Sequence, residues 1–261
     1  MEPDGNYLGA MHVPRIQPFV FAILLMPCCI VSVAQDKAGT MVPNGGFERV
    51  SAAPHTYDQL KLAEGWSNIT LGLSEVFDPT AAPKTVGLPQ NGYGAIMPGE
   101  GVRCAGFFAW KDDQRRNWEG GSEDPFRPGW SAYSEYLMVE LAEPLEGRRS
   151  YTFSMSLALA STSDRAVSGI GAYFSPVALR YEHRRFLEEK AQVASGTILA
   201  ERGVWTAVSG TFEAVGGERY LVIGVFPYVG FETQRIIEGP DNQYAYYFLD
   251  ALELVPGDAA Q

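Results

Sequence analysis

A stretch of aromatic and charged residues between two apolar segments has the composition of a sugar-binding site. Pyranose rings present apolar C–H faces and rims of hydroxyl groups, so their sites combine flat aromatic rings with a few planar polar groups. Residues 111–132 have no strand character, and stretches of this length without secondary structure are usually functional or disordered. In and beside this loop we expect the ligand-binding residues Trp110, Asp113, Arg115, Arg116, Trp118 and Trp130. The alternative is that these aromatic side chains fold back and close the edge of the fold.

A carboxylate in the last apolar segment is a second candidate for chemistry. Asp250 has the same strand parity as Leu252 and Leu254, so its side chain is predicted to point toward the interior. A buried carboxylate requires a cation, a hydrogen-bonding network or a raised pKa. Near the start of the chain, Gly45 and Gly46 could turn backbone carbonyl groups toward an ion. The alternative is that Asp250 accepts backbone hydrogen bonds and that Glu48 is a solvated strand end, with no ion between them.

Short segments with alternating polarity must hold these residues in place. The clearest is 151–159, YTFSMSLAL, which puts Tyr151, Phe153 and Met155 on one face. Further segments of this kind are 102–110, 134–142, 169–175, 204–214, 219–226 and 246–255. Gly, Pro, Asn and Asp turns separate them, as expected of an antiparallel β-sandwich. Only 178–191 has helical composition, and it predicts a short insert helix.

The N-terminal segment predicts export. Arg15 is followed by the apolar run 18–34, which is typical of a secretory signal peptide. We therefore expect residues 1–34 to be a signal peptide and 35–261 to form one domain. The predicted location is secreted, periplasmic or at the cell surface.

The composition narrows the function classes. The formal net charge of -11 argues against nucleic acid as a partner. Of 3 cysteines only Cys104 lies beyond the predicted signal peptide, so stability must come from a core or from metal. Beyond that segment the histidines are His55 and His183, which leaves little material for a histidine-based catalytic or metal site.

Several segments, in this order along the chain, resemble the galactose-binding-like jelly-roll module of exported and cell-surface proteins of Gram-negative bacteria. They include MVPNGGFE at 41–48, GWSNITLGLSEVF at 65–77, NGYGAIMPGEGVRCAGFF at 91–108 and YYFLDALEL at 246–254. The resemblance is to carbohydrate-binding modules of this type. It implies an all-β fold, a jelly-roll β-sandwich of two antiparallel sheets, and a binding role at the cell surface.

The same resemblance implies a calcium ion. In related carbohydrate-binding jelly rolls, the Phe-Glu pair near the start and the first Asp of the last strand help to bind structural calcium, which takes six to eight oxygen ligands. Carried onto this sequence, the metal set is Asn44, Glu48 and Asp250. Relatives tend to show two adjacent Asp in the last strand, whereas here Asp250 is followed by Ala251.

These observations predict an exported, non-catalytic binding module for a glycan or another cell-surface ligand. The first alternative is a structural subunit of a bacterial envelope or secretion assembly, which binds protein through the sandwich face. A weaker alternative is a polysaccharide-active enzyme. A glycan binder requires a platform or cleft with at least two aromatic rings, whereas an assembly subunit requires a flat apolar patch.

Overall fold

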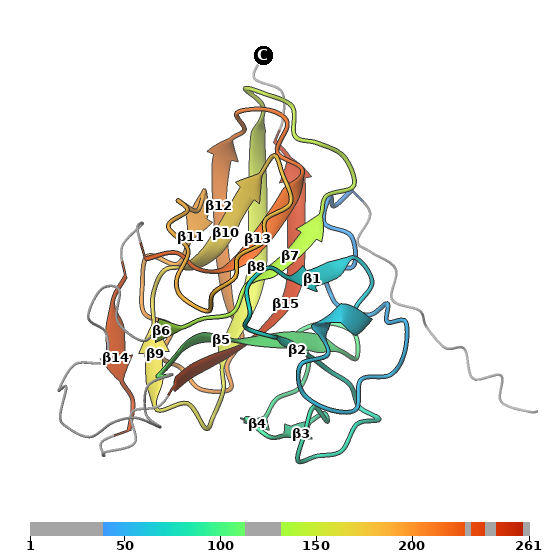
Figure 1. Ribbon diagram of the computed structural model, residues 1–261, viewed down its shortest axis with the longest axis vertical. Helices are drawn as coiled ribbons and strands as arrows, with labels where there is room; N and C mark the ends of the chain where they lie inside the picture. The colour runs from blue at the N-terminus through green and yellow to red at the C-terminus, as the bar shows by residue number, and fades with distance from the viewer. Residues whose placement is uncertain (1–38, 113–131, 228–230, 238–243, 258–261) are drawn as a thin grey trace, which may run out of the picture. The chain divides into compact units, whose positions relative to one another are not determined.

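The computed structural model describes residues 39–112, 132–227, 231–237 and 244–257 (Figure 1). All the described residues belong to one compact unit, Val33–Gln261. The predicted signal peptide, 1–34, lies outside the described residues. Within the described ranges, no helix has the length and apolar character needed to span a membrane.

Two antiparallel sheets make up most of the described part of the chain. The five-stranded sheet contains, in spatial order, β1 (Trp66–Asn68), β7 (Leu137–Glu140), β13 (Tyr220–Val225), β10 (Ile170–Ser175) and β11 (Val193–Ala194). The six-stranded sheet contains β12 (Thr206–Glu213), β8 (Ser150–Leu159), β15 (Tyr244–Pro256), β5 (Cys104–Asp112) and β2 (Glu75–Phe77), with β6 (Ala132–Tyr133) paired to β5. Two small sheets pair β14 (Thr233–Arg235) with β9 (Arg165–Val167) and β3 (Gln90–Asn91) with β4 (Gly94–Ala95), and a 3-10 turn η1 occupies Leu60–Leu62. The predicted all-β, jelly-roll β-sandwich fold is confirmed.

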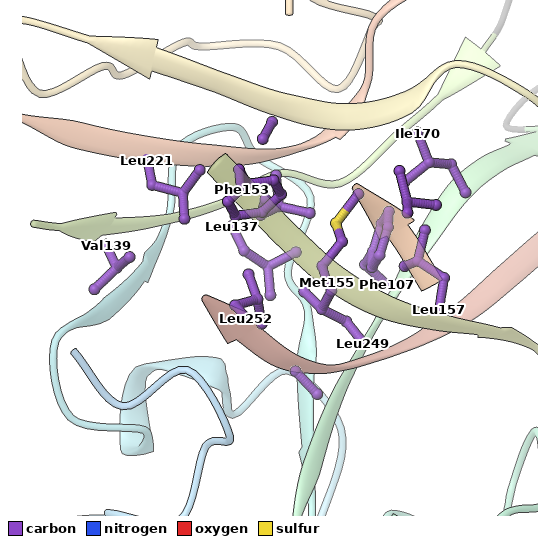
Figure 2. Packing of buried hydrophobic residues seen from close by; sticks show 14 of the residues in the cluster. Phe107, Leu137, Val139, Phe153, Met155, Leu157, Ile170, Leu221, Leu249 and Leu252 are labelled. Carbon is purple, nitrogen blue, oxygen red and sulfur yellow. The ribbon is translucent and has the colours of Figure 1, made fainter. Parts of the chain in front are cut away.

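The main core lies between the two large sheets. The alternation predicted at 151–159 is confirmed in β8, where Phe153, Met155 and Leu157 are each no more than 1% exposed. Figure 2 shows these side chains packed with Val139 of β7 and Leu221 of β13, among other residues. Burying apolar surface at about 25 cal/mol per Å² is the main stabilising term of such a core. This rigid core supports the loops and strand ends described below.

The predicted insert helix at 178–191 is wrong, because this segment is an extended strap across the five-stranded sheet. Its backbone hydrogen-bonds to other segments in place of an intrahelical ladder. These bonds are Tyr181 N–H to the Ile69 carbonyl (2.7 Å), Leu71 N–H to the His183 carbonyl (3.0 Å) and Ser134 N–H to the Arg184 carbonyl (2.8 Å). Leu187 is 1% exposed in an apolar cluster on the outer face of that sheet. Tertiary contacts have therefore overridden a modest helical propensity.

A second apolar layer covers the outer face of the six-stranded sheet. Strand residues that point to this face include Cys104 and Phe108 of β5 and Tyr246 and Phe248 of β15. Segment 78–103, which carries β3 and β4, packs over them and lies beyond β2 and β5 in Figure 1. The sheet is consequently buried on both faces at this end.

Candidate functional site

A set of aromatic rings surrounds two buried carboxylates at the edge of this outer layer. We name it the aromatic-carboxylate cluster, and its members are Tyr57, Glu75, Tyr93, Phe108, Tyr133, Glu135, Tyr244 and Tyr246. They come from β2, β5, β6 and β15, from the turn between β3 and β4, and from loops before η1 and β7. The cluster therefore depends on the six-stranded sheet and on the segments that cover it.

The ladder between β5 and β15 forms the floor of the cluster. Phe108 lies opposite Tyr246, and Lys111 lies opposite Tyr244. Regular alternation would place Lys111 and Phe108 on opposite faces of β5, since they are three residues apart. A β-bulge skips Ala109, which reverses the parity. Lys111 consequently shares a face with Phe108, and its Nζ lies 4.8 Å from the Phe108 ring centroid.

Gly106 makes room for the ring of Tyr246. A Cβ atom on Gly106 would lie 2.3 Å from the Tyr246 hydroxyl and 2.7 Å from Cε2 of Phe77. Both distances are far shorter than van der Waals contact, so a side chain at this position would displace the ring. With glycine there, the Tyr246 hydroxyl reaches across β5 and donates to Oε2 of Glu75 (2.5 Å).

The two carboxyl groups are almost completely buried. Glu75 is 2% exposed, and its Oε1 accepts a hydrogen bond from the Tyr93 hydroxyl (3.2 Å). Glu135 is 1% exposed and accepts hydrogen bonds from the Tyr133 hydroxyl and from Phe108 N–H (2.9 Å). Burial raises the pKa of Glu135 to about 8. Burial, and then repulsion from Glu135, raise the pKa of Glu75 well above its ordinary value.

The rings of the cluster hold one another in place. Tyr93 and Tyr246 stack with centroids 3.7 Å apart and an interplanar angle of 12°. Phe108 makes edge contacts with Tyr93 (5.6 Å), Tyr133 (5.9 Å) and Tyr244 (5.5 Å). Such pairs contribute about 0.5–1.5 kcal/mol each beyond burial. Phe108 is only 8% exposed, whereas Tyr93, Tyr133 and Tyr244 are partly exposed.

The structure places Trp110 in the main core. Its ring is 0% exposed, and the guanidinium of Arg165 lies 5.5 Å from the ring centroid. The bulge in β5 turns this ring inward, so it is not a platform that faces solvent. The other predicted ligand-binding residues, Asp113, Arg115, Arg116, Trp118 and Trp130, lie outside the described residues.

Asn44 shapes the first turn of the domain. Its Oδ1 accepts a hydrogen bond from Arg49 N–H (2.9 Å), while its Nδ2 donates to the carbonyls of Arg49 (2.9 Å) and Glu64 (3.1 Å). Its own carbonyl accepts from the Trp66 indole (3.0 Å). Asn44 also has a positive φ of 54°, which Asn tolerates better than most residues. The amide is therefore used to fix the chain, not directed toward a shared ion.

Glu48 and Asp250 both bind the same loop, residues 99–103. Oδ2 of Asp250 accepts the Glu100 N–H (2.9 Å), and Oε1 of Glu48 accepts the N–H groups of Val102 (2.8 Å) and Arg103 (3.0 Å). The Arg103 guanidinium adds contacts to the Glu48 carbonyl (3.1 Å) and to Oε2 of Glu48 (3.8 Å). The two carboxylates expected to share an ion thus share a loop.

Asp250 is buried, but on the face opposite to the one its parity indicated. The ladder between β15 and β8 shifts between Asp250 and Glu253, and Ala251 has a φ of 54°. Leu249 and Leu252 therefore both point into the main core, although they are three residues apart. Asp250 is 0% exposed, and burial raises its pKa to about 7. Its backbone hydrogen bonds match the alternative that required no ion.

The three residues predicted to bind calcium make contacts with other protein groups. Calcium takes six to eight oxygen ligands at 2.3–2.6 Å. In the part of the chain that the structure describes, no group of three or more His, Cys, Asp or Glu side chains is placed to hold a metal. The side-chain oxygens of Asn44 and Asp250 accept backbone N–H groups, and Arg103 supplies a positive charge beside Glu48. Calcium binding stays an untested prediction.

Sequence reasoning missed Glu75 and Glu135. Glu75 lies in the segment 65–77 that carried the family resemblance and Glu135 in the predicted strand segment 134–142, and the sequence analysis treated both as ordinary polar residues. The parity test applied to Asp250 could have found Glu135, because it shares parity with the buried Leu137 and Val139. The tyrosines around them were missed because an aromatic residue in a strand is most often part of the core.

No protein-family model matches the chain, and no curated protein matches it. Among solved structures it is similar to the CBM22-1 and GH10 modules of endo-1,4-beta-D-xylanase 10B from Clostridium thermocellum, complexed with xylohexaose (11% identity, TM-score 0.39, 85% of this chain and 30% of that chain). It is also similar to the CBM22-1 xylan-binding domain of Paenibacillus barcinonensis Xyn10C (13% identity, TM-score 0.38, 83% of this chain and 94% of that chain). A third similar structure is the K1 cleaved adhesin domain of Lys-gingipain from Porphyromonas gingivalis (12% identity, TM-score 0.39, 80% of this chain and 94% of that chain).

These similar structures contain CBM22-1 modules, in one case with a GH10 module, and a cleaved adhesin domain. The chain spans about 30% of the length of the xylanase chain. With identities of 11–13% and TM-scores below 0.4, the similarities carry no conclusion about the ligand of this chain. The fold class rests on the strand order and pairing described above.

Proposed function

We propose that this chain is an exported, non-catalytic glycan-binding module whose ligand lies on the aromatic-carboxylate cluster. One observation carries the proposal: partly exposed tyrosine rings are held rigidly over two buried carboxyl groups. Stacking on aromatic rings is the interaction that the apolar faces of a sugar require. The phenol hydroxyls add the polar contacts that orient the hydroxyl rim.

Rigidity of the rings favours binding. Tyr93 stacks on Tyr246 and donates a hydrogen bond to Glu75, while Tyr133 donates a hydrogen bond to Glu135. A side chain that is already immobilised loses little conformational entropy when a ligand arrives, and ordering a mobile one costs about 0.5–1.5 kcal/mol. The carboxyl groups thus serve as supports for the binding surface.

The same hydrogen bonds favour a binding role over catalysis. Each carboxyl group accepts two hydrogen bonds from protein groups, and neither is more than 2% exposed. A general acid must come within about 3 Å of the atom that it protonates. Both carboxyl groups are covered by the rings that a sugar would contact first.

A glycan array tests the proposal. We expect the purified domain to retain at least one glycan and expect Tyr133→Ala and Tyr244→Ala to abolish that retention. Tyr220→Ala is the matched control, because Tyr220 is a partly buried tyrosine of β13 in the other sheet. Circular dichroism should report an unchanged fold for each variant. Failure to retain any glycan, or retention that survives both cluster variants, overturns the proposal and would favour the assembly-subunit alternative.

A further inference from the structure

Two basic side chains lie over the rings of the cluster. Lys111 comes from β5, and its Nζ lies 4.8 Å from the ring centroid of Phe108 and 5.7 Å from that of Tyr133. Arg184 comes from the strap over the other sheet, and its Cζ lies 5.7 Å from the centroid of Tyr133. The Arg184 carbonyl accepts the Ser134 N–H (2.8 Å), which fixes the strap beside β6. Segments far apart in the chain thus bring two cations to one ring.

Neither cation forms an ion pair with another residue that the structure describes. Among the described residues, the salt bridges within 4.0 Å involve other arginines, and neither Lys111 nor Arg184 takes part in one. Lys111 is close enough to Glu135 to favour its ionised form, but burial has the larger effect on that pKa. The raised pKa favours the neutral form of Glu135, so this carboxyl compensates the lysine charge less than an exposed carboxylate would.

The location of this positive charge is unusual for such an acidic chain. The net charge is -11, so a basic rim at the candidate site is not a consequence of composition. Among the described residues, the exposed carboxylate of Asp58 is close enough to raise the pKa of both Glu75 and Glu135. Lys111 and Arg184 therefore provide two positive charges beside Tyr133 that could attract a negative group.

We propose that the glycan bound here is acidic and that Lys111 and Arg184 bind the carboxylate of a uronic acid residue while the sugar ring rests on Tyr133. This inference rests on the proposed function and narrows it to a ligand class. A guanidinium can take a carboxylate through two parallel hydrogen bonds, and an ammonium adds a point charge with three donors. Charge-assisted hydrogen bonds are roughly twice as strong as neutral ones.

Matched polymers separate charge from shape. The probes are polygalacturonate and alginate, each compared with its carboxyl-reduced counterpart, which keeps the linkages but has a neutral sugar in place of each uronic acid. We expect isothermal titration calorimetry at pH 7 to show binding of at least one acidic polymer about tenfold or more tighter than its reduced form. That preference should shrink as salt is raised from 0.05 to 0.5 M, because salt screens exposed charges.

Variants assign the preference to the two cations. Lys111→Met and Arg184→Met keep an aliphatic stem, and each should weaken binding of the acidic polymer about tenfold, a larger loss than for the reduced form. Lys111→Arg, which keeps the charge, should retain most of the affinity. Arg219→Met is the control, since Arg219 forms an exposed pair with Glu140 outside the cluster. Thermal denaturation of each variant separates a loss of fold from a loss of charge.

The outcomes distinguish this inference from the proposed function. Equal binding of acidic and reduced polymers, or retention of neutral glycans alone on the array, overturns the proposal that the ligand is acidic. Either result leaves the proposal of glycan binding intact. Acid-selective binding that survives both methionine variants overturns the role of Lys111 and Arg184. Absence of binding to every polymer and to the whole array overturns both proposals together.

Discussion

Replacing Glu135 by glutamine should flatten the pH dependence of stability. The pKa of this carboxyl is raised from 4.5 to about 8, mainly by burial. Between these values the folded protein keeps a proton that the unfolded chain releases, so stability falls as pH rises through this window. One such group costs about 1.4 kcal/mol per pH unit, or about 4 kcal/mol from pH 5 to pH 8. That is a large part of the 5–15 kcal/mol typical of a domain.

The glutamine variant removes this titration and preserves the shape of the side chain. Its amide can accept from Phe108 N–H and donate to the Tyr133 hydroxyl oxygen, the two groups that contact Glu135. Urea denaturation at pH 5, 6, 7 and 8 gives the free energy of unfolding at each pH. We expect the wild type to lose several kcal/mol over this range and the variant to lose markedly less. Glu140→Gln in β7 controls for removal of an exposed glutamate as such.

Glu75 sharpens the test because its pKa is raised by burial and by repulsion from Glu135. The free energy of unfolding of the double variant Glu75→Gln, Glu135→Gln should therefore depend less on pH than that of either single variant. The effects of the two single substitutions on this pH dependence should not add. Parallel curves for the wild type and Glu135→Gln would refute the reasoning, because they would mean that the carboxyl titrates alike in the folded and unfolded chain.

Three further predictions concern other parts of the domain. Gly106→Ala should destabilise the fold by about 1–3 kcal/mol in urea denaturation, since the added Cβ meets Tyr246 and overpacking costs this much; an unchanged midpoint would contradict the packing argument. If an ion is held at Asp250, EDTA should lower the melting temperature of the wild type and have little further effect on Asp250→Ala. An equal response of both proteins would contradict calcium binding at Asp250. If the 111–132 loop contributes to glycan binding, Trp118→Ala and Trp130→Ala should weaken retention on the array without a shift in melting temperature. Unchanged retention would remove the loop from the site.

Strand patterns could be predicted from the sequence wherever packing alone decides conformation. The segment 151–159 alternates because one face of β8 packs in the main core and the other does not. The strap at 178–191 was mispredicted because its conformation depends on backbone partners far away in the chain, which no local propensity encodes. Asp250 was correctly predicted to be buried, but its direction depends on a bulge at Ala251 that alternation does not reveal.

A single skipped residue in β5 explains both what the sequence misplaced and what it missed at the candidate site. Without the bulge at Ala109, alternation would keep Trp110 on the face of Phe108 and turn Lys111 to the opposite face. With it, the largest aromatic ring of the segment joins the main core, and an ammonium group takes its place beside Phe108 and Tyr133. A bulge changes the chemistry of a strand surface in this way without changing its composition. The face of β5 where Trp110 was expected to form an aromatic platform therefore carries Lys111, and for this reason the acidic polymers are the decisive probes.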